Sequence, residues 1–129
     1  MSDRVQIEPL SSFQDSRGVV FKPLLADELA QQRDVHVVVT EPGCVRGNHR
    51  HQHGTESMTV YGPALVRCQE GDTITDTEVA AGDIVRFTIP AGVAHAVKNT
   101  GDRPSLMVVF NSDAYNDNQP DVTRVQLFE

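Results

Sequence analysis

Long apolar segments and an excess of positive charge are both missing from this sequence. No apolar run approaches the about 20 residues that a helix needs to cross a bilayer, and Met1 to Arg4 lack the apolar region of a signal peptide. Only 11 Lys and Arg residues stand against 18 Asp and Glu residues, which gives a formal net charge of −7. Binding to a nucleic-acid backbone needs a basic face, so this balance argues against it. We expect a soluble, cytoplasmic protein that acts on a small molecule, without membrane or nucleic-acid partners.

Cysteine is also scarce. Cys44 and Cys68 are the only two, and they do not form a Cys-x-x-Cys pair. We therefore expect two reduced thiols rather than a disulfide. With 129 residues, the chain is long enough to enclose an apolar core in one domain without help from disulfides.

Strand signals dominate the chain. Runs of β-branched and apolar residues alternate with turns rich in Gly, Pro and Asp, at a spacing of about 8–12 residues that is typical of β-sandwiches and barrels. Only the segment 24–32, rich in Leu, Ala, Glu and Gln, favours a short helix. Strands are expected over residues 5–7, 19–21, 35–40, 55–61, 64–69, 73–79, 84–89, 94–99, 106–110 and 122–128, with a turn at 15–18.

Four of the five histidines lie in two short segments. His49 and His51 are two residues apart, so strand alternation places both imidazoles on one face, and Glu56 follows five residues later. His95 follows a turn that contains Pro90 and Gly92. Imidazole and carboxylate groups bind divalent transition metals, and a set without cysteine fits a reactive site better than a closed structural one. We predict one divalent metal ion, with zinc as the first expectation and iron, nickel or manganese left open.

The two segments resemble the two motifs of the cupin superfamily. The first reads Gly-x5-His-x-His-x4-Glu from Gly43 to Glu56, and the second reads Pro-x-Gly-x2-His-x3-Asn from Pro90 to Asn99. The resemblance implies an all-β fold, the cupin double-stranded β-helix or jelly roll, with the metal inside. The alternative is a cupin that has lost its metal.

A narrower resemblance covers most of the chain. The sequence is similar to the C-terminal cupin domain of capsular-polysaccharide assembling proteins and to the ketoisomerases of dTDP-4-keto-6-deoxyhexoses. This implies epimerisation or ketone migration on a nucleotide-linked deoxy keto sugar, in polysaccharide or glycoside biosynthesis. The segments that carry the similarity are 15–18, 45–51, Glu56, 89–102, 112–115 and 118–123.

Such a reaction needs a base that removes a proton next to a carbonyl group, and histidine is the usual one. His36 is the candidate because it interrupts a run of valines on a strand expected to line the barrel. The alternative, that His36 points to solvent, is equally open. Tyr61 and Tyr115 are further candidates for donating or accepting a proton, although either could simply pack.

Arginines are candidates for binding a pyrophosphate through charge-assisted hydrogen bonds. Arg46 leads this group because it belongs to the Arg-Gly-Asn-His motif, and Arg67 and Arg86 follow. Asn99, the last residue of the second motif, is placed with them as a substrate-binding residue. Each of these arginines could instead be a surface residue.

Two other functions use the same ligand set. One is an iron-dependent dioxygenase acting on a small molecule, and the other is a metal-containing binding module without catalysis. An apolar cavity would favour the first, and a cavity closed by bulky side chains would favour the second. A homodimer is also expected, with the strand from Val5 to Ile7 pairing across it.

Overall fold

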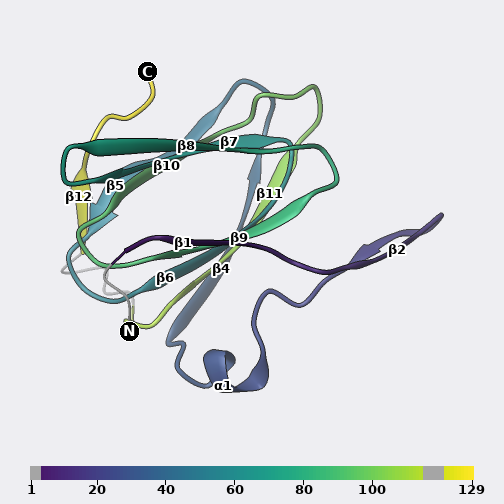
Figure 1. Cartoon of the computed structure of the whole chain (residues 1–129), viewed down its shortest axis with the longest axis horizontal. Helices are drawn as coiled ribbons and strands as arrows, with labels where there is room; N and C mark the ends of the chain where they lie inside the picture. Colours follow the sequence, from purple (N-terminus) through teal and green to yellow (C-terminus); the bar gives the residue numbers. More distant parts are fainter. Residues whose placement is uncertain (1–3, 115–120) are drawn as a thin grey trace.

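The computed structural model describes residues 4–114 and 121–129, whose regular secondary structure is almost entirely β-strand (Figure 1). Among these residues, no helix has the length and apolar character needed to cross a membrane. The elements are β1 (Gln6–Pro9), β2 (Phe13–Asp15), β3 (Gly18–Val20), α1 (Ala26–Leu29), β4 (Asp34–Thr40), β5 (Val45–His51), β6 (Glu56–Tyr61), β7 (Ala64–Glu70), β8 (Thr73–Val79), β9 (Ile84–Ile89), β10 (Ala94–Lys98), β11 (Ser105–Asn111) and β12 (Val122–Arg124).

Two five-stranded antiparallel sheets form the body of the described molecule. Their strand orders are β1-β9-β6-β11-β4 and β12-β5-β10-β7-β8. The pairs β4–β11, β5–β10, β6–β9 and β7–β8 are nested, so residues 34–111 form one long antiparallel ribbon whose successive pairs alternate between the two sheets. This winding is the jelly roll, and it buries one face of each sheet against the other.

The core lies between the sheets and follows the alternation of the strands. On β7, every second residue is buried (Ala64, Val66 and Cys68), while Leu65 and Arg67 between them are partly exposed. The same period on β9 and β11 supplies further core residues. The core cluster is Met58, Val60, Ala64, Val66, Cys68, Val79, Phe87, Ile89, Val93, Val97, Met107 and Val109.

A short hairpin, β2–β3, extends away from this body (Figure 1). The expected turn at its tip is present, since Asp15 Oδ1 accepts the Arg17 N–H at 2.9 Å and Gly18 has a φ of +137°. The first arm, β2, was not predicted because Phe13-Gln-Asp15 is too short to show an alternation.

The other predicted elements agree with the structure to different degrees. The strands 73–79 and 84–89 match β8 and β9 without change. The helix predicted over 24–32 was too long, because only Ala26–Leu29 is helical and none of its residues is buried. A helix of this length without a packed face gains little from its own hydrogen bonds. The last strand is also shorter than predicted and ends at Arg124.

Candidate metal centre

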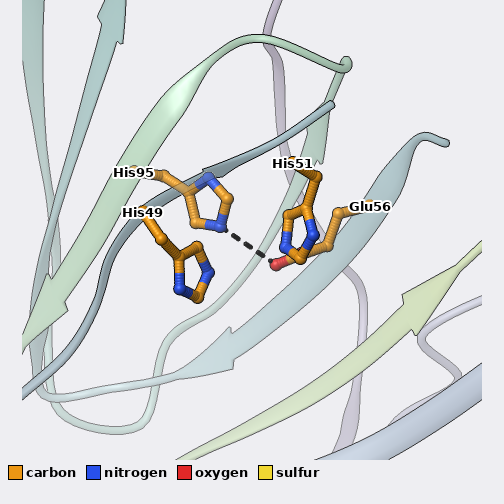
Figure 2. Close-up of side chains that lie close together, drawn as sticks. All are labelled: His49, His51, Glu56 and His95. Atoms are coloured by element: carbon orange, nitrogen blue, oxygen red, sulfur yellow. Dashed lines mark ion pairs between the residues drawn. The ribbon is translucent and has the colours of Figure 1, made fainter. Parts of the chain in front are cut away.

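Four side chains from three strands converge inside the jelly roll (Figure 2). His49 and His51 lie on β5, Glu56 begins β6, and His95 lies on β10. One potential ligand atom from each lies within 4.8 Å of the others. Glu56 is at the centre of the group, with Oε2 at 2.6 Å from His51 Nε2 and Oε1 at 3.2 Å from His95 Nε2.

The histidine nitrogens of this group are placed better for binding a metal ion than for hydrogen bonding within the group. His51 Nε2 and His95 Nε2 are buried, yet neither makes a hydrogen bond of good geometry to any described residue. The other ring nitrogen of His95 lies 3.2 Å from the Val93 carbonyl, which can only accept, so Nδ1 carries the proton. His95 Nε2 is therefore the ring nitrogen directed at Glu56 and its neighbours. A fixed tautomer of this kind is what a metal-binding histidine requires.

A bulge in β5 sets the direction of the histidine strand. Between His95↔His49 and Ala96↔Gly47 the pairing of β10 with β5 shifts by one residue, which leaves Asn48 as the extra residue. Gly47 and Asn48 both have positive φ, +90° and +58°. Gly47 is required here, since an added Cβ would meet the His95 carbonyl oxygen at 2.8 Å. Because the extra residue inverts the alternation, Arg46 faces the same cavity as His49.

Burial and mutual charge keep His49 and Glu56 in the forms that bind a metal. Burial, together with the neighbouring His95 and His51, lowers the pKa of His49 to about 4, so its imidazole is neutral at physiological pH. Burial alone would raise the pKa of Glu56, but contacts with His51 and His95 outweigh it and hold the pKa below its usual value. The Glu56 carboxylate raises the pKa of His51 in return. The centre therefore offers a carboxylate and at least one neutral imidazole near neutrality.

The cluster lies where two hollows meet. One has a volume of about 280 Å³ and is lined by His36 and Arg46 together with the apolar side chains of Val38, Met58, Val97, Met107 and Val109. The other, of about 360 Å³, is lined by three aspartates, Asp34, Asp113 and Asp121. Both are bounded by His36, His49, His51 and Glu56, and we call the two together the histidine cavity.

Residues 13–123 match the family described as the polysaccharide biosynthesis C-terminal domain. The chain belongs to this family. Among curated proteins, the spore coat polysaccharide biosynthesis protein SpsL of Bacillus subtilis (strain 168) is 24% identical over 135 residues, covering 97% of this chain and 89% of that protein.

Solved structures of similar fold support the family assignment. The capsular polysaccharide assembling protein CapF from Staphylococcus aureus shares 26% identity with a TM-score of 0.68, over 92% of this chain and 35% of CapF. This chain therefore spans about a third of the length of CapF. QdtA from Thermoanaerobacterium thermosaccharolyticum, a sugar 3,4-ketoisomerase solved in complex with TDP, shares 15% identity with a TM-score of 0.72, over 98% of this chain and 91% of QdtA. The predicted cupin fold and the narrower resemblance are both confirmed.

Within this family fold, two further residues named from the sequence line the histidine cavity. His36 lies on β4 opposite Val109 of β11 and lines both hollows, with its side chain exposed toward the opening. Arg46 lines the smaller hollow and reaches solvent. The valines on either side of His36, Val35 and Val37, are more than half exposed, so β4 directs His36 and its valines to opposite faces.

The other two arginines named from the sequence, Arg67 and Arg86, lie elsewhere and have partners of their own. Arg67 binds Asp76 at 2.7 Å, donates to the Leu127 carbonyl and stacks over the Phe128 ring at 4.3 Å. Arg86 lies in a separate groove. These contacts argue against either arginine as a pyrophosphate ligand, and we revise that part of the expectation.

Asn99 and Tyr61 are also away from the histidine cavity. The Asn99 amide is fully buried, where it donates to the carbonyls of Thr40 and Arg103 at 2.8 and 2.7 Å. It therefore joins two turns instead of contacting a ligand. Tyr61 stacks on Phe21, with ring centroids 6.4 Å apart. Tyr115 lies outside the described residues.

Sequence reasoning missed the aspartates of the larger hollow. Asp121 belongs to the segment 118–123 that carries the family resemblance, but no role was assigned to it. Its position depends on the pairing of β12 with β5, two strands about 70 residues apart in the sequence. The Asp121 carboxylate accepts hydrogen bonds from backbone N–H groups about 70 residues earlier in the chain, so no short-range sequence pattern identifies it.

Proposed function

We propose that this chain is a metal-dependent epimerase or ketoisomerase that acts on a nucleotide-linked deoxy keto sugar in polysaccharide or glycoside biosynthesis. One observation supports this most strongly. Three imidazoles and one carboxylate converge within 4.8 Å in a cavity that also contains a separate imidazole, His36, and a guanidinium, Arg46. Metal ligands, a base and an anion-binding group are the parts that this chemistry needs. The similarity in fold to QdtA, which binds TDP, points to the same substrate class.

His49, His51, Glu56 and His95 would hold the ion, with zinc as the first expectation. A divalent ion bound there supplies Lewis-acid polarisation of a carbonyl oxygen. The fixed Nδ1 proton of His95 and the lowered pKa of His49 support this assignment because both leave a nitrogen free to coordinate. The carboxylate of Glu56 adds the negative charge that balances the ion.

His36 is the proposed base. A ring nitrogen of His36 accepts the proton from the carbon next to the carbonyl, the C–H electron pair forms a C=C bond, and the C=O π pair moves onto the oxygen to give an enediolate. Protonation of the same carbon on its opposite face by a water molecule inverts that centre, and His36 then releases its proton to solvent. Return of the proton to the former carbonyl carbon, with loss of the neighbouring hydroxyl proton, moves the ketone instead. Because His36 lines both hollows, it can serve either outcome.

Arg46 is the proposed ligand of the diphosphate. Its guanidinium offers the paired donors that phosphate oxygens accept, and the bulge at Gly47 and Asn48 turns it toward the cavity. The larger hollow, by contrast, is lined by Asp34, Asp113 and Asp121, which repel phosphate. We therefore expect the diphosphate on the Arg46 side and the sugar hydroxyls toward the aspartates.

An iron-dependent dioxygenase is the second candidate. The observation in its favour is the apolar wall of the smaller hollow, formed by Val38, Met58 and Val97 with two neighbours. Such a wall suits a small apolar substrate better than a sugar. A binding module without catalysis has less support, because the two hollows leave open volume beside the cluster.

We also propose a homodimer. β1 and β4 form the two edges of their sheet, and neither has a second strand partner among the described residues. β1 overlaps the segment Val5–Ile7 that was expected to pair across the dimer. Light scattering at micromolar concentration tests this, and a monomer would contradict it.

The decisive experiment combines metal content with proton exchange. The wild-type protein and His51→Ala, purified without chelator or metal-affinity resin, are analysed for bound metals, with the exposed His53→Ala as the matched control. We expect about one zinc per chain in the wild type and in His53→Ala, and loss of metal in His51→Ala. In D2O, the wild type should exchange the proton next to the keto group of a TDP-linked 4-keto-6-deoxyhexose. Iron together with oxygen uptake, and no exchange, would favour the dioxygenase instead.

A further inference from the structure

The C-terminal segment 121–128 lies along the strand that carries two of the metal-ligand candidates. β12 pairs antiparallel with β5, and Val122 is opposite His51 while Arg124 is opposite His49. Figure 1 shows this segment, in yellow, beside β5 at the edge of its sheet. Without β12, β5 would itself be the edge strand. The segment therefore covers the backbone of the histidine strand.

One end of the segment is fixed by the carboxylate of Asp121. Its Oδ1 accepts the N–H of Gln52 at 3.1 Å, and its Oδ2 accepts the N–H of His53 at 2.8 Å. Both amides come directly after His51, in the connection that leads to Glu56. One carboxylate thus satisfies two consecutive backbone donors between two metal-ligand candidates. Hydrogen bonds to a charged acceptor are stronger than neutral ones.

The other end of the segment is fixed at the bulge. Asn48 Oδ1 accepts the N–H groups of Leu127 and Phe128 at 3.0 and 3.1 Å, and its Nδ2 donates to the Phe128 carbonyl at 3.0 Å. The Asn48 carbonyl accepts the N–H of Val125 at 2.9 Å. Phe128 is buried and lies against Arg67. The segment is therefore anchored on both sides of His49 and His51.

We propose that Asp121 is a positioning residue of the metal centre. By holding the connection between His51 and Glu56, it presets the distance between their ligand atoms before metal binds. This inference rests on the proposed function, because it requires the four-residue cluster to bind a metal. Ligands held in place by outer hydrogen bonds bind metal more tightly, and loss of such a partner typically costs about 10- to 100-fold in affinity.

The test measures zinc affinity by chelator competition in wild type, Asp121→Ala, Asp121→Asn and Asp72→Asn. Asp72 is an exposed residue of the β7–β8 turn, so Asp72→Asn removes the same charge away from the site. We expect a loss of about 10- to 100-fold in Asp121→Ala, a smaller loss in Asp121→Asn, which keeps one acceptor oxygen, and no change in Asp72→Asn. Melting temperatures of the metal-free proteins and the visible spectrum of bound cobalt accompany each measurement.

A purely structural role predicts a different result. It would lower the melting temperature of metal-free Asp121→Ala while leaving the zinc affinity and the cobalt spectrum of the folded protein unchanged, and that result would overturn the inference. Wild-type affinity in Asp121→Ala would overturn it as well, although the metal centre would stand. If the wild type itself fails to bind zinc or cobalt, the proposed function fails and the positioning role falls with it.

Discussion

The groove at the β2–β3 hairpin and the histidine cavity both contain charged residues, and they differ in how those charges are paired. The groove, which we call the Arg86 groove, has a volume of about 560 Å³, and in it Arg86 donates to Glu8, Glu28 and the Pro23 carbonyl, each at 3.1 Å, while its buried Nε has no partner among the described residues. Each of the two hollows of the histidine cavity is smaller than this groove. The Nε2 atoms of its His51 and His95 make no hydrogen bond of good geometry to a described residue. The Arg86 groove pairs one cation with two carboxylates, whereas the histidine cavity sets three imidazoles around one carboxylate.

The physical meaning of this difference is that a satisfied charge stabilises the fold, whereas an unsatisfied buried donor or acceptor costs free energy unless a ligand uses it. Arg86 joins β9 to β1 and to α1, so its ion pairs fasten the N-terminal segment to the sheet. In the histidine group, the single carboxylate of Glu56 faces three imidazoles, so nitrogen atoms remain available to a ligand. Parallel substitutions in the Arg86 groove and in the histidine cavity can therefore separate charged residues that stabilise the fold from those that serve a ligand.

The largest difference is expected from neutralising one glutamate in each hollow. Glu56→Gln keeps the size of the side chain but removes the charge between His51 and His95, so zinc affinity should fall by more than the about 100-fold that loss of an outer hydrogen-bond partner can cost. Glu28→Gln, which weakens a contact with Arg86, should leave zinc affinity unchanged. Isothermal titration with zinc measures both. Equal affinities in the two variants would remove the distinction between the hollows.

A smaller effect is expected at the bulge that turns β5. In Gly47→Ala, the new Cβ would meet the His95 carbonyl oxygen at 2.8 Å on a backbone with φ of +90°. We expect a loss of about 2–3 kcal/mol in the free energy of unfolding, together with weaker zinc binding, because β5 and β10 must move apart. Urea unfolding and zinc titration measure the two effects.

Gly82→Ala is the matched control for this substitution. Gly82 has nearly the same φ, +86°, but no described atom outside its immediate neighbours lies within 4 Å of the added Cβ. It should cost only the conformational strain, about 1 kcal/mol, and leave zinc binding unchanged. If the two variants lose equal stability, the close approach of Gly47 to His95 does not contribute to the free energy of unfolding.

The same contrast explains what the sequence could predict. His49 and His51 were placed by strand alternation, and Glu56 and His95 by motifs of a few residues, so short-range patterns were enough to predict that these four side chains come together. The position of Arg86 could not be predicted in this way because its partners are distant in the sequence: Glu8 is 78 residues away. The role of Asn48 was hidden for the same reason, since its side chain binds Phe128. Local pattern predicts which residues share a face, but it does not predict which charges are already paired.

The smallest expected effect is a pH dependence confined to the histidine cavity. The pKa of His49 is about 4 in the folded chain and about 6.5 when unfolded, so the unfolded state binds more protons between these values. The contribution of His49 to the stability of the metal-free protein is therefore complete above pH 6.5 and is lost as the pH falls toward 4. His51, whose pKa is raised, works in the opposite direction and makes the net effect small.

A comparison of variants isolates the contribution of His49. In His49→Asn, which removes this titration, the metal-free protein should lose less stability between pH 7 and pH 4.5 than the wild type. Arg86→Ala should be less stable at every pH but follow the wild-type pH dependence, because its ion pairs lie outside the histidine cavity. Urea unfolding at several pH values measures all three proteins. A wild-type pH profile in His49→Asn would mean that His49 is solvated in the folded state, and a neutral imidazole preset for metal would then have to be sought in His51 or His95.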